Sequence, residues 1–291
     1  ERGIRIIGDV PIYVAGDSVD VWTNPSQFYL DENLELIDVA GCPPDAFSAD
    51  GQLWGNPLFR WDVMREDGYS WWTMRLRKMS TLYDVIRIDH FRGFDSYYAI
   101  PGKDTTARNG VWRNGPGMEL FRAVEEKLGK LDIIVEDLGF LTPSVLQLVA
   151  DSGYPGMKVV QFAFDSRDDS DYMPHNYDKH CVVYTGTHDN DTILGWMKQA
   201  PKNSVKKAKE YLRMTKEEGY NWGMMCGAWM SSANLAVVTM QDLIGLGSSA
   251  RMNIPSTLGG NWTWRALPGQ INAPLANKLH HKTELYGRLR R

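Results

Sequence analysis

The sequence predicts an α/β protein built on a parallel β-sheet, and three observations lead to this prediction. Six short runs are almost continuously apolar and β-branched, which is typical of parallel strands buried on both faces. Helical segments alternate with these runs, as they do in βα units. Polar residues follow the ends of the runs. Since a closed (β/α)₈ barrel needs eight strands, a six-stranded open sheet competes with it here.

The predicted elements alternate in chain order. The strands are expected at residues 4–10, 84–89, 132–137, 158–164, 181–187 and 235–242. Helices are expected at residues 68–83, 117–128, 143–152 and 204–216, with Thr142 as N-cap and Pro143 in the first helical position of the third. Residues 41–57, rich in Gly and Pro, are too long for an ordinary connection and predict a functional loop.

Composition excludes several classes of protein. A net charge of −4 over 291 residues leaves no basic surface typical of nucleic-acid binding. No apolar run reaches the ~18 residues of a membrane-spanning helix, and the N-terminus does not resemble a signal peptide. Cys42, Cys181 and Cys226 are odd in number and widely spaced, which fits a reducing cytosol. We therefore expect a cytoplasmic protein without nucleic-acid or membrane partners.

Acidic residues at the ends of the predicted strands indicate an active site. Polar groups occur there repeatedly: Asp9, Asp89, Glu136, His188 with Asp189, and Asp242. A single residue of this kind most often caps a helix or begins a turn. Five such positions, at the sheet edge where α/β proteins carry their sites, favour catalysis instead.

The stretch "VIRIDHFRGF" places Arg87 and Asp89 on the same side of a strand, because side chains alternate. An arginine beside a carboxylate lowers the pKa of that acid and keeps it ionised, as a nucleophile or charge stabiliser requires. Glu136 follows three apolar residues, and partial desolvation would raise its pKa toward that of a general acid. Asp189 supplies a third acid, and His188 a donor for a sugar hydroxyl.

Metal binding is the rival use of these residues. The "DNDT" stretch at residues 189–192 lacks the Gly and the terminal Glu of a calcium-binding EF-hand loop, and no His/Cys spacing fits zinc. A phosphoryl-transfer protein would need a Gly-rich phosphate loop, which is absent from the sequence. We therefore expect no metal and no cofactor. Three carboxylates with an Arg and a His, in a chain with 11 Trp, 13 Tyr and 9 Phe, indicate glycosidic-bond chemistry, although aromatic residues also pack cores.

Five motifs, in order, carry a family resemblance: "GDVPIYVAGDSVDVW", "GQLWGNPLFRWD", "VIRIDHFRGF", "IIVEDLG" and "VVYTGTHDNDT". With "ARMNIPSTLGGNWTWR" near the end, they resemble the 4-α-glucanotransferases, or amylomaltases, of the α-amylase clan of glycoside hydrolases. The resemblance extends from about Gly8 to Leu267. It implies a (β/α)₈ TIM barrel and a retaining, double-displacement transfer of α-1,4-glucan segments between maltooligosaccharides.

The resemblance also implies roles for particular residues. Asp89 matches the nucleophile, Glu136 the general acid/base and Asp189 the third carboxylate. The residues that match substrate contacts are Arg87, His188, Asp9, Trp54 on an overhanging loop with Asp45 and Gln52 nearby, and Asn261.

Members of this family carry an N-terminal portion with the first two barrel strands, and the chain lacks a match to it. The resemblance thus implies a single catalytic barrel domain over residues 1–291 that holds strands three to eight, with an insertion around residues 41–57. An N-terminal segment of the same enzyme would then be a partner of this chain, beside its glucan substrates. Two other functions stay open: a hydrolase of the same clan, and an inactive glucan-binding fragment.

Overall fold

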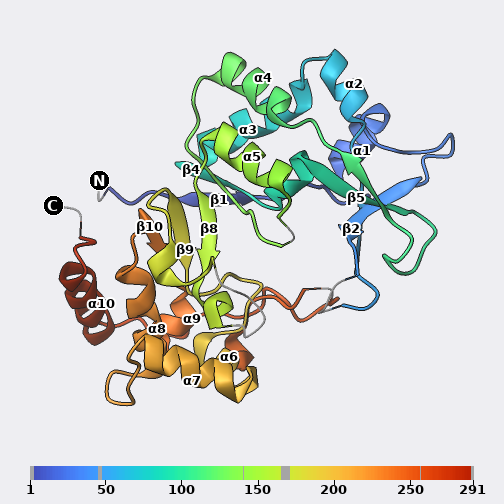
Figure 1. The fold of residues 1–291 in the computed structure, drawn as a ribbon. Helices are drawn as coiled ribbons and strands as arrows, with labels where there is room; N and C mark the ends of the chain where they lie inside the picture. The colour runs from blue at the N-terminus through green and yellow to red at the C-terminus, as the bar shows by residue number, and fades with distance from the viewer. Residues whose placement is uncertain (1–2, 45–47, 140, 165–170, 256, 290–291) are drawn as a thin grey trace. The chain divides into compact units, whose positions relative to one another are not determined.

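The computed structural model describes residues 3–44, 48–139, 141–164, 171–255 and 257–289. The chain divides into two compact units, Glu1–Gly156 (unit 1) and Met157–Arg291 (unit 2) (Figure 1). Five of the six predicted runs contain a strand and the run 158–164 overlaps the end of one, so the prediction of an α/β fold with parallel sheets is confirmed. Whether residues 1–291 form one barrel domain stays a prediction.

A three-stranded parallel sheet lies at the centre of unit 1. Its strands pair in the order β1-β4-β7, with bounds β1 (Ile7–Val10), β4 (Val85–Ile88) and β7 (Ile133–Val135). Ile86, Ile88 and Val135 are buried, as the continuous apolar runs predicted. Asp89 and Glu136 directly follow β4 and β7, whereas Asp9 is the last residue but one of β1.

Helices follow the strands of unit 1 as βα units require. Their bounds are α1 (Val19–Thr23), α2 (Trp61–Glu66), α3 (Ser70–Leu82), α4 (Met118–Leu128) and α5 (Pro143–Ser152), with 3-10 helices η1 (Pro25–Gln27) and η2 (Phe91–Phe94). Helix α3 packs on β1 and β4, and α4 contacts both α3 and α5. The Thr142 side chain accepts a hydrogen bond from the Val145 N–H, so the predicted N-cap of α5 is confirmed.

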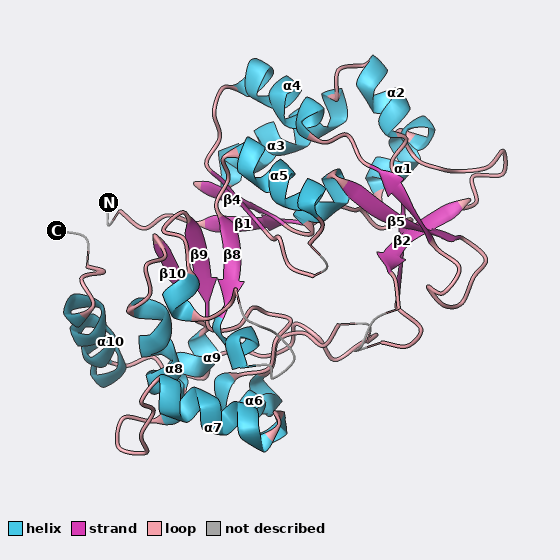
Figure 2. Ribbon diagram, viewed as in Figure 1, coloured by secondary structure: helices cyan, strands magenta, loops and turns pink. Residues whose placement is uncertain are grey.

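A second sheet of unit 1 is antiparallel and was not predicted. It has the order β3-β2-β5-β6, with bounds β2 (Asp38–Cys42), β3 (Gln52–Pro57), β5 (Ser96–Pro101) and β6 (Val111–Asn114) (Figure 2). The prediction of a loop over residues 41–57 is therefore wrong at both ends, which are strands of a hairpin. Gly41 explains the misreading: a Cβ there would lie 2.1 Å from the Gln52 carbonyl oxygen, so close strand pairing requires glycine.

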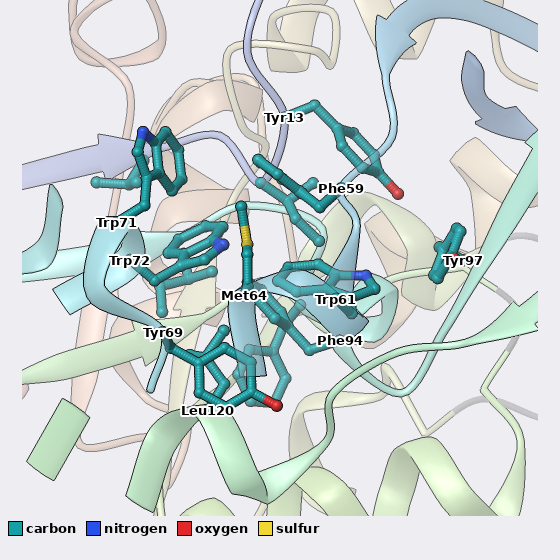
Figure 3. Close-up of a cluster of buried hydrophobic side chains, with 14 of the residues drawn as sticks. Tyr13, Phe59, Trp61, Met64, Tyr69, Trp71, Trp72, Phe94, Tyr97 and Leu120 are labelled. Carbon is teal, nitrogen blue, oxygen red and sulfur yellow. The ribbon is translucent and has the colours of Figure 1, made fainter. Parts of the chain in front are cut away.

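Much of the aromatic excess packs the core of unit 1. Figure 3 shows Trp61, Trp72, Phe59 and Phe94 among buried neighbours, and the latter three are fully buried. Their rings meet at tilted and edge-to-face angles, such as 65° between Phe59 and Trp72 with centroids 5.8 Å apart. The aromatic residues were expected either to bind sugars or to pack the core. These four residues pack the core.

Unit 2 holds a third parallel pairing, between β9 (Cys181–Tyr184) and β10 (Leu235–Val237), in a sheet of order β10-β9-β8 with β8 (Gly156–Val159). Its helices are α6 (Ile193–Gln199), α7 (Lys202–Tyr211), α8 (Tyr220–Trp229), α9 (Met240–Ile244) and α10 (Ala273–Leu285), with 3-10 helices η3 (Val160–Phe164), η4 (Pro174–Asn176) and η5 (Ser248–Ala250). Helix α7 begins two residues before its predicted start and ends at Tyr211.

Two predicted strands of unit 2 are shorter than expected. The run 158–164 leaves the sheet at Val159 and continues as η3, because a short apolar run can be a buried helix as well as a strand. The run 235–242 ends as β10 at Val237. Thr239 then caps α9, its side chain accepting from the Asp242 N–H.

Asp242 is consequently not at a strand end, and its grouping with the site acids is wrong. It lies in the first turn of α9 and is 1% exposed. Its carboxylate accepts hydrogen bonds from the Ile193 N–H at 2.7 Å and from the Thr185 hydroxyl at 3.3 Å. Asp242 therefore joins α9 to the start of α6.

Among the residues described, every helix is too short or too polar to cross a bilayer.

Candidate active site

Three charged side chains of unit 1 form an ion-pair cluster at the ends of β1 and β4. Arg87 Nη1 donates to both carboxylate oxygens of Asp9, at 2.6 and 2.7 Å, and to Asp89 Oδ1 at 3.0 Å. The Arg87 side chain is only 10% exposed, whereas those of Asp9 and Asp89 are 41% and 36% exposed. The cluster thus has a buried cation under two accessible carboxylates.

Strand register explains why these residues meet. Asp9 and Arg87 are direct partners across the parallel pairing of β1 with β4. Asp89 follows β4 by one residue, and its N–H still donates to the Val10 carbonyl at 3.0 Å, so the ladder continues to that position. Because side chains alternate, Arg87 and Asp89 share one side of the strand, as predicted.

Electrostatics favours the charged form of Arg87. Burial alone lowers the pKa of the guanidinium, but the negative charges of Asp9 and Asp89 outweigh it, and the net pKa of Arg87 is raised. The arginine is therefore a permanent cation beside Asp89. By the same Coulombic attraction, it favours the ionised form of that carboxylate, which is the form a nucleophile needs.

Glu136 follows β7 and has the opposite electrostatic character. Desolvation by burial, and next the negative charge of Asp89, raise its pKa to about 7, against the opposing influence of Arg87. Its Oε2 accepts from the His90 N–H at 2.7 Å and its Oε1 from the Leu138 N–H at 3.1 Å, which orients the carboxyl group. A carboxylic acid with a pKa near neutrality can both donate and accept a proton.

His90 is a site residue that the sequence analysis did not select. Its φ of 51° lies in the left-handed region, an unusual conformation for a residue other than Gly, and its N–H is the one directed at Glu136. Burial, and then the nearby Arg92, lower the pKa of its ring to about 3, so the imidazole is neutral at physiological pH. The only sequence signal for His90 was that it directly follows Asp89.

Trp54 belongs to strand β3, so its predicted place on an overhanging loop is wrong. The half-buried indole packs against the His90 ring, with centroids 4.8 Å apart and planes at 86°, and against Tyr13 at 6.2 Å. Its Nε1–H donates to Gln52 Oε1 at 3.1 Å, so these two predicted residues do lie together. Asp45 lies outside the described residues.

In unit 2, His188 and Asp189 lie in the turn after β9. His188 Nε2 is 3.3 Å from Asp189 Oδ2. Asn253, which the sequence analysis did not select, donates from Nδ2 to Asp189 Oδ1 at 2.6 Å, and Arg251 donates from Nη2 to the Asp189 carbonyl at 2.5 Å. Both carboxylate oxygens of Asp189 are therefore oriented. The quoted stretch "ARMNIPSTLGGNWTWR" contained Asn253 and Arg251, but nothing in it indicated that they reach Asp189.

The side chain of Asn261 forms hydrogen bonds only within its own segment, among the described residues. Its Oδ1 accepts from the Ile254 N–H at 3.1 Å and its Nδ2 donates to the Thr257 carbonyl and hydroxyl. The next residue, Trp262, is 53% exposed and its ring lies 5.0 Å from that of His188. Trp262 is therefore a second aromatic residue near the site residues that the sequence analysis did not select. The high content of aromatic residues was the only sequence signal for it.

No group of three or more His, Cys, Asp or Glu side chains suited to a metal ion occurs within the part of the chain that the structure describes.

A family model described as 4-alpha-glucanotransferase matches residues 1–270. The chain belongs to the 4-α-glucanotransferase family. It is 50% identical to the 4-alpha-glucanotransferase of Clostridium butyricum and 47% identical to that of Thermus thermophilus, and each match covers 99% of this chain. The same matches cover 60% and 59% of those relatives, so the chain spans about three-fifths of their length.

Solved structures agree with this family assignment. The amylomaltase of Streptococcus agalactiae, determined in complex with acarbose, is 41% identical and superposes with a TM-score of 0.96 over 99% of this chain and 58% of its own. The amylomaltase of Corynebacterium glutamicum, at 20% identity and a TM-score of 0.74, shares the fold over 98% of this chain and 46% of its own. The resemblance stated from motifs is thus confirmed, and a mixed α/β fold similar to amylomaltase is established.

Within this 4-α-glucanotransferase family member, the site residues divide between the two units. Unit 1 brings together a carboxyl group paired with an arginine, Asp89 with Arg87, and an acid whose pKa is raised to about 7, Glu136. Two neighbouring carboxyl groups in such different environments are the arrangement by which glycoside chemistry distinguishes the acid from the nucleophile.

Proposed function

We propose that this chain supplies the catalytic residues of a retaining 4-α-glucanotransferase, which transfers α-1,4-glucan segments between maltooligosaccharides or starch-type glucans. One observation supports this proposal above the others. Glu136, with its pKa raised to about 7, lies close enough to Asp89 to be affected by its charge, while Arg87 holds Asp89 at 3.0 Å. Retaining mechanisms need such a pair.

In the first half-reaction, an Asp89 carboxylate oxygen attacks the anomeric carbon of the donor glucan. The glycosidic C–O bond breaks, and the protonated Glu136 gives its proton to the departing oxygen. The product is a glycosyl ester on Asp89 and a shortened glucan, with inversion at the anomeric carbon. The His90 and Leu138 N–H groups hold the carboxyl group of Glu136 for this transfer.

In the second half-reaction, Glu136 is the base. It takes the proton from the 4-hydroxyl of an acceptor glucan, whose oxygen attacks the anomeric carbon and releases Asp89. The second inversion restores the original configuration, and Glu136 is again protonated. The same acid thus serves in both directions, which a pKa close to the working pH favours.

We assign the remaining predicted residues by the same proposal. Asp189 would be the third carboxylate that binds the distorted sugar, oriented by Asn253, and His188 would donate to a sugar hydroxyl. Asp9 would bind the sugar at the cleavage position while sharing Arg87 with Asp89.

A hydrolase is the second candidate, since the same carboxyl groups would serve it if water intercepted the glycosyl ester. Incubation with maltotriose separates the two functions: transfer produces glucose together with maltopentaose and longer chains, whereas hydrolysis produces only shorter sugars. We expect longer chains from a protein that contains residues 1–291. Products no longer than maltotriose would contradict the proposal.

An inactive glucan-binding fragment is the remaining alternative for residues 1–291 alone. The matched relatives are longer than this chain, which is the observation that keeps this alternative open. The maltotriose assay is therefore run on this chain and on any longer natural polypeptide that contains it. Glucan binding without turnover in both would favour the alternative.

We further propose a cytoplasmic location and action without a cofactor. Cys42, Cys181 and Cys226 are odd in number and widely spaced along the sequence, which supports a reducing compartment. Plant relatives are described as chloroplastic or amyloplastic, so the compartment varies among relatives. Turnover that survives prolonged treatment with a metal chelator is the expected result.

A further inference from the structure

A polar pocket of about 600 Å³ lies within unit 1 and shares no residue with the Asp9–Arg87–Asp89–Glu136 group. Its volume is within the ~300–1,000 Å³ of typical small-molecule sites. The strands β5 and β6, the end of η2 and the start of α5 contribute its walls. The lining side chains that matter are Arg92, Asp95, Ser96, Trp112, Asn114 and Ser144.

A hydrogen-bonded network holds the base of this pocket in place. Arg92, only 4% exposed, donates from Nη2 to the Ser96 hydroxyl at 3.0 Å. The Ser96 and Ser144 hydroxyls both donate to Asp95 Oδ2, at 2.9 and 3.0 Å. The carboxylate of Asp95 is therefore oriented by two separate elements before any ligand arrives, which lowers the entropic cost of binding.

Trp112 supplies an aromatic wall. The Arg92 guanidinium carbon lies 4.0 Å from its ring centroid, and the buried Tyr98 ring lies 5.2 Å away at 62°. These contacts hold the indole in one orientation while 42% of the residue stays exposed. An exposed, immobilised aromatic surface is suited to the apolar C–H faces of a sugar ring.

Several polar atoms at the pocket have no protein partner among the described residues. They are the side-chain amide of Asn114, the indole N–H of Trp112 and Oδ1 of Asp95. Together they offer donors and acceptors within one pocket. A ligand that carries hydroxyl groups can satisfy both kinds at once, because each hydroxyl donates and accepts.

The charges of the pocket decide between ligand classes. Among the described residues that line the pocket, Arg92 is the one cation and Asp95 the one anion, so their charges balance. A phosphate or sulfate would lie against the Asp95 carboxylate, and an apolar ligand would leave Asn114 and Asp95 desolvated without hydrogen bonds. A neutral polyol with apolar ring faces avoids both costs.

We propose that this pocket is a second, non-catalytic binding site for a glucose unit of an α-glucan chain. The choice of an α-glucan among neutral polyols rests on the proposed function. The site holds a long glucan to unit 1 away from the reacting carboxyl groups, and it raises the affinity for long substrates through a second point of attachment.

The test follows the indole N–H resonance of Trp112 in ¹⁵N-labelled protein, identified by its loss in Trp112→Phe, during titration with maltoheptaose. The protein carries Glu136→Gln to prevent turnover. We expect a saturable shift, and a midpoint about three- to tenfold higher in Asn114→Ala, as the loss of one or two hydrogen bonds predicts. Asn109→Ala, an exposed residue of the same β5–β6 hairpin that bonds Asp104, is the matched control and should leave the midpoint unchanged.

Three results would overturn the proposal: no saturable shift, a midpoint insensitive to Asn114→Ala, or saturation by inorganic phosphate at lower concentration than by maltoheptaose. The maltotriose assay keeps the two proposals separate. Longer products without a shift at Trp112 would refute the pocket alone. A shift dependent on Asn114, in a protein without turnover, would refute the proposed function and support the pocket as a glucan site.

Discussion

The acids of unit 1 are held by paired strands, whereas the acid of unit 2 is held by a turn and a distant segment. Asp9 and Arg87 are register partners, and Asp89 continues the same ladder. Asp189 instead depends on Asn253 and Arg251, more than sixty positions along the chain. Alternation along one strand and register between two strands place the charged groups of unit 1 together, whereas the orientation of a turn residue requires contacts with a distant segment.

The largest expected effect comes from Asp89→Asn. The substitution keeps the volume of the side chain and removes the nucleophile, so turnover should fall by about 10⁴-fold or more while the fold persists. Turnover of maltotriose and circular dichroism measure the two parts of this prediction. Asp62→Asn, which alters an exposed carboxylate paired with Arg60, is the control. If the Asp89→Asn variant transferred glucan at a near-normal rate, Asp89 would not be the nucleophile.

Arg87→Leu should lower both stability and activity. It leaves Asp9 and Asp89 without their shared cation, and we expect a loss of about 2–3 kcal/mol in the free energy of unfolding. The loss is smaller than for a fully buried pair because both carboxylates are over a third exposed. Urea denaturation measures it. Arg60→Leu breaks the exposed pair with Asp62 and should cost less than ~1 kcal/mol; equal losses in the two variants would mean that burial of Arg87 adds nothing.

Asn253→Ala should affect activity more than stability. Loss of a hydrogen bond to a charged group corresponds to ~1.5–3 kcal/mol, hence a fall of about 10- to 100-fold in kcat/KM. Asn253→Asp should be worse, because it brings a second carboxylate to Asp189 Oδ1. Thr263→Ala, which removes an exposed hydroxyl on the same segment that donates to the Gly260 carbonyl, is the control and should leave kcat/KM unchanged. A loss at Thr263→Ala as large as that at Asn253→Ala would contradict the role assigned to Asn253.

Glu136 should make stability depend on pH in unit 1. Its ordinary pKa of 4.5 applies to the unfolded chain, and about 7 applies to the fold, so the folded protein binds the extra proton between these values. Its contribution is fully present below about pH 4.5 and is lost as the pH rises through about 7. Unfolding free energies from pH 5 to pH 8 measure this slope, and Glu136→Gln should flatten it. An unchanged slope in that variant would show that another group is responsible.

The same ionisation should appear in the kinetics. The first half-reaction needs protonated Glu136, so kcat/KM should fall as the pH rises through about 7.

Sequence reasoning succeeded where local periodicity controls structure. The β-branched runs located strands in all six predicted places, and Thr142-Pro143 located the start of α5. It failed where contacts with other segments, or a capping residue, determine the secondary structure. The Gly- and Pro-rich segment 41–57 lies in a hairpin in which β2 and β3 pair with each other and β2 also pairs with β5. The end of the predicted strand 235–242 is instead the first turn of α9, which Thr239 caps.

By itself, the sequence determined that Arg87 and Asp89 share one side of a strand and that Glu136 follows another strand, because strand periodicity is a local property. Only the tertiary structure decided that Asp9 shares Arg87 and that Asp242 joins two helices. It also decided that Glu136 titrates near neutrality and that Asn253 orients Asp189. The physical reason is that hydrogen bonds and desolvation depend on atoms far apart in the chain, and single-sequence patterns carry no distance between them.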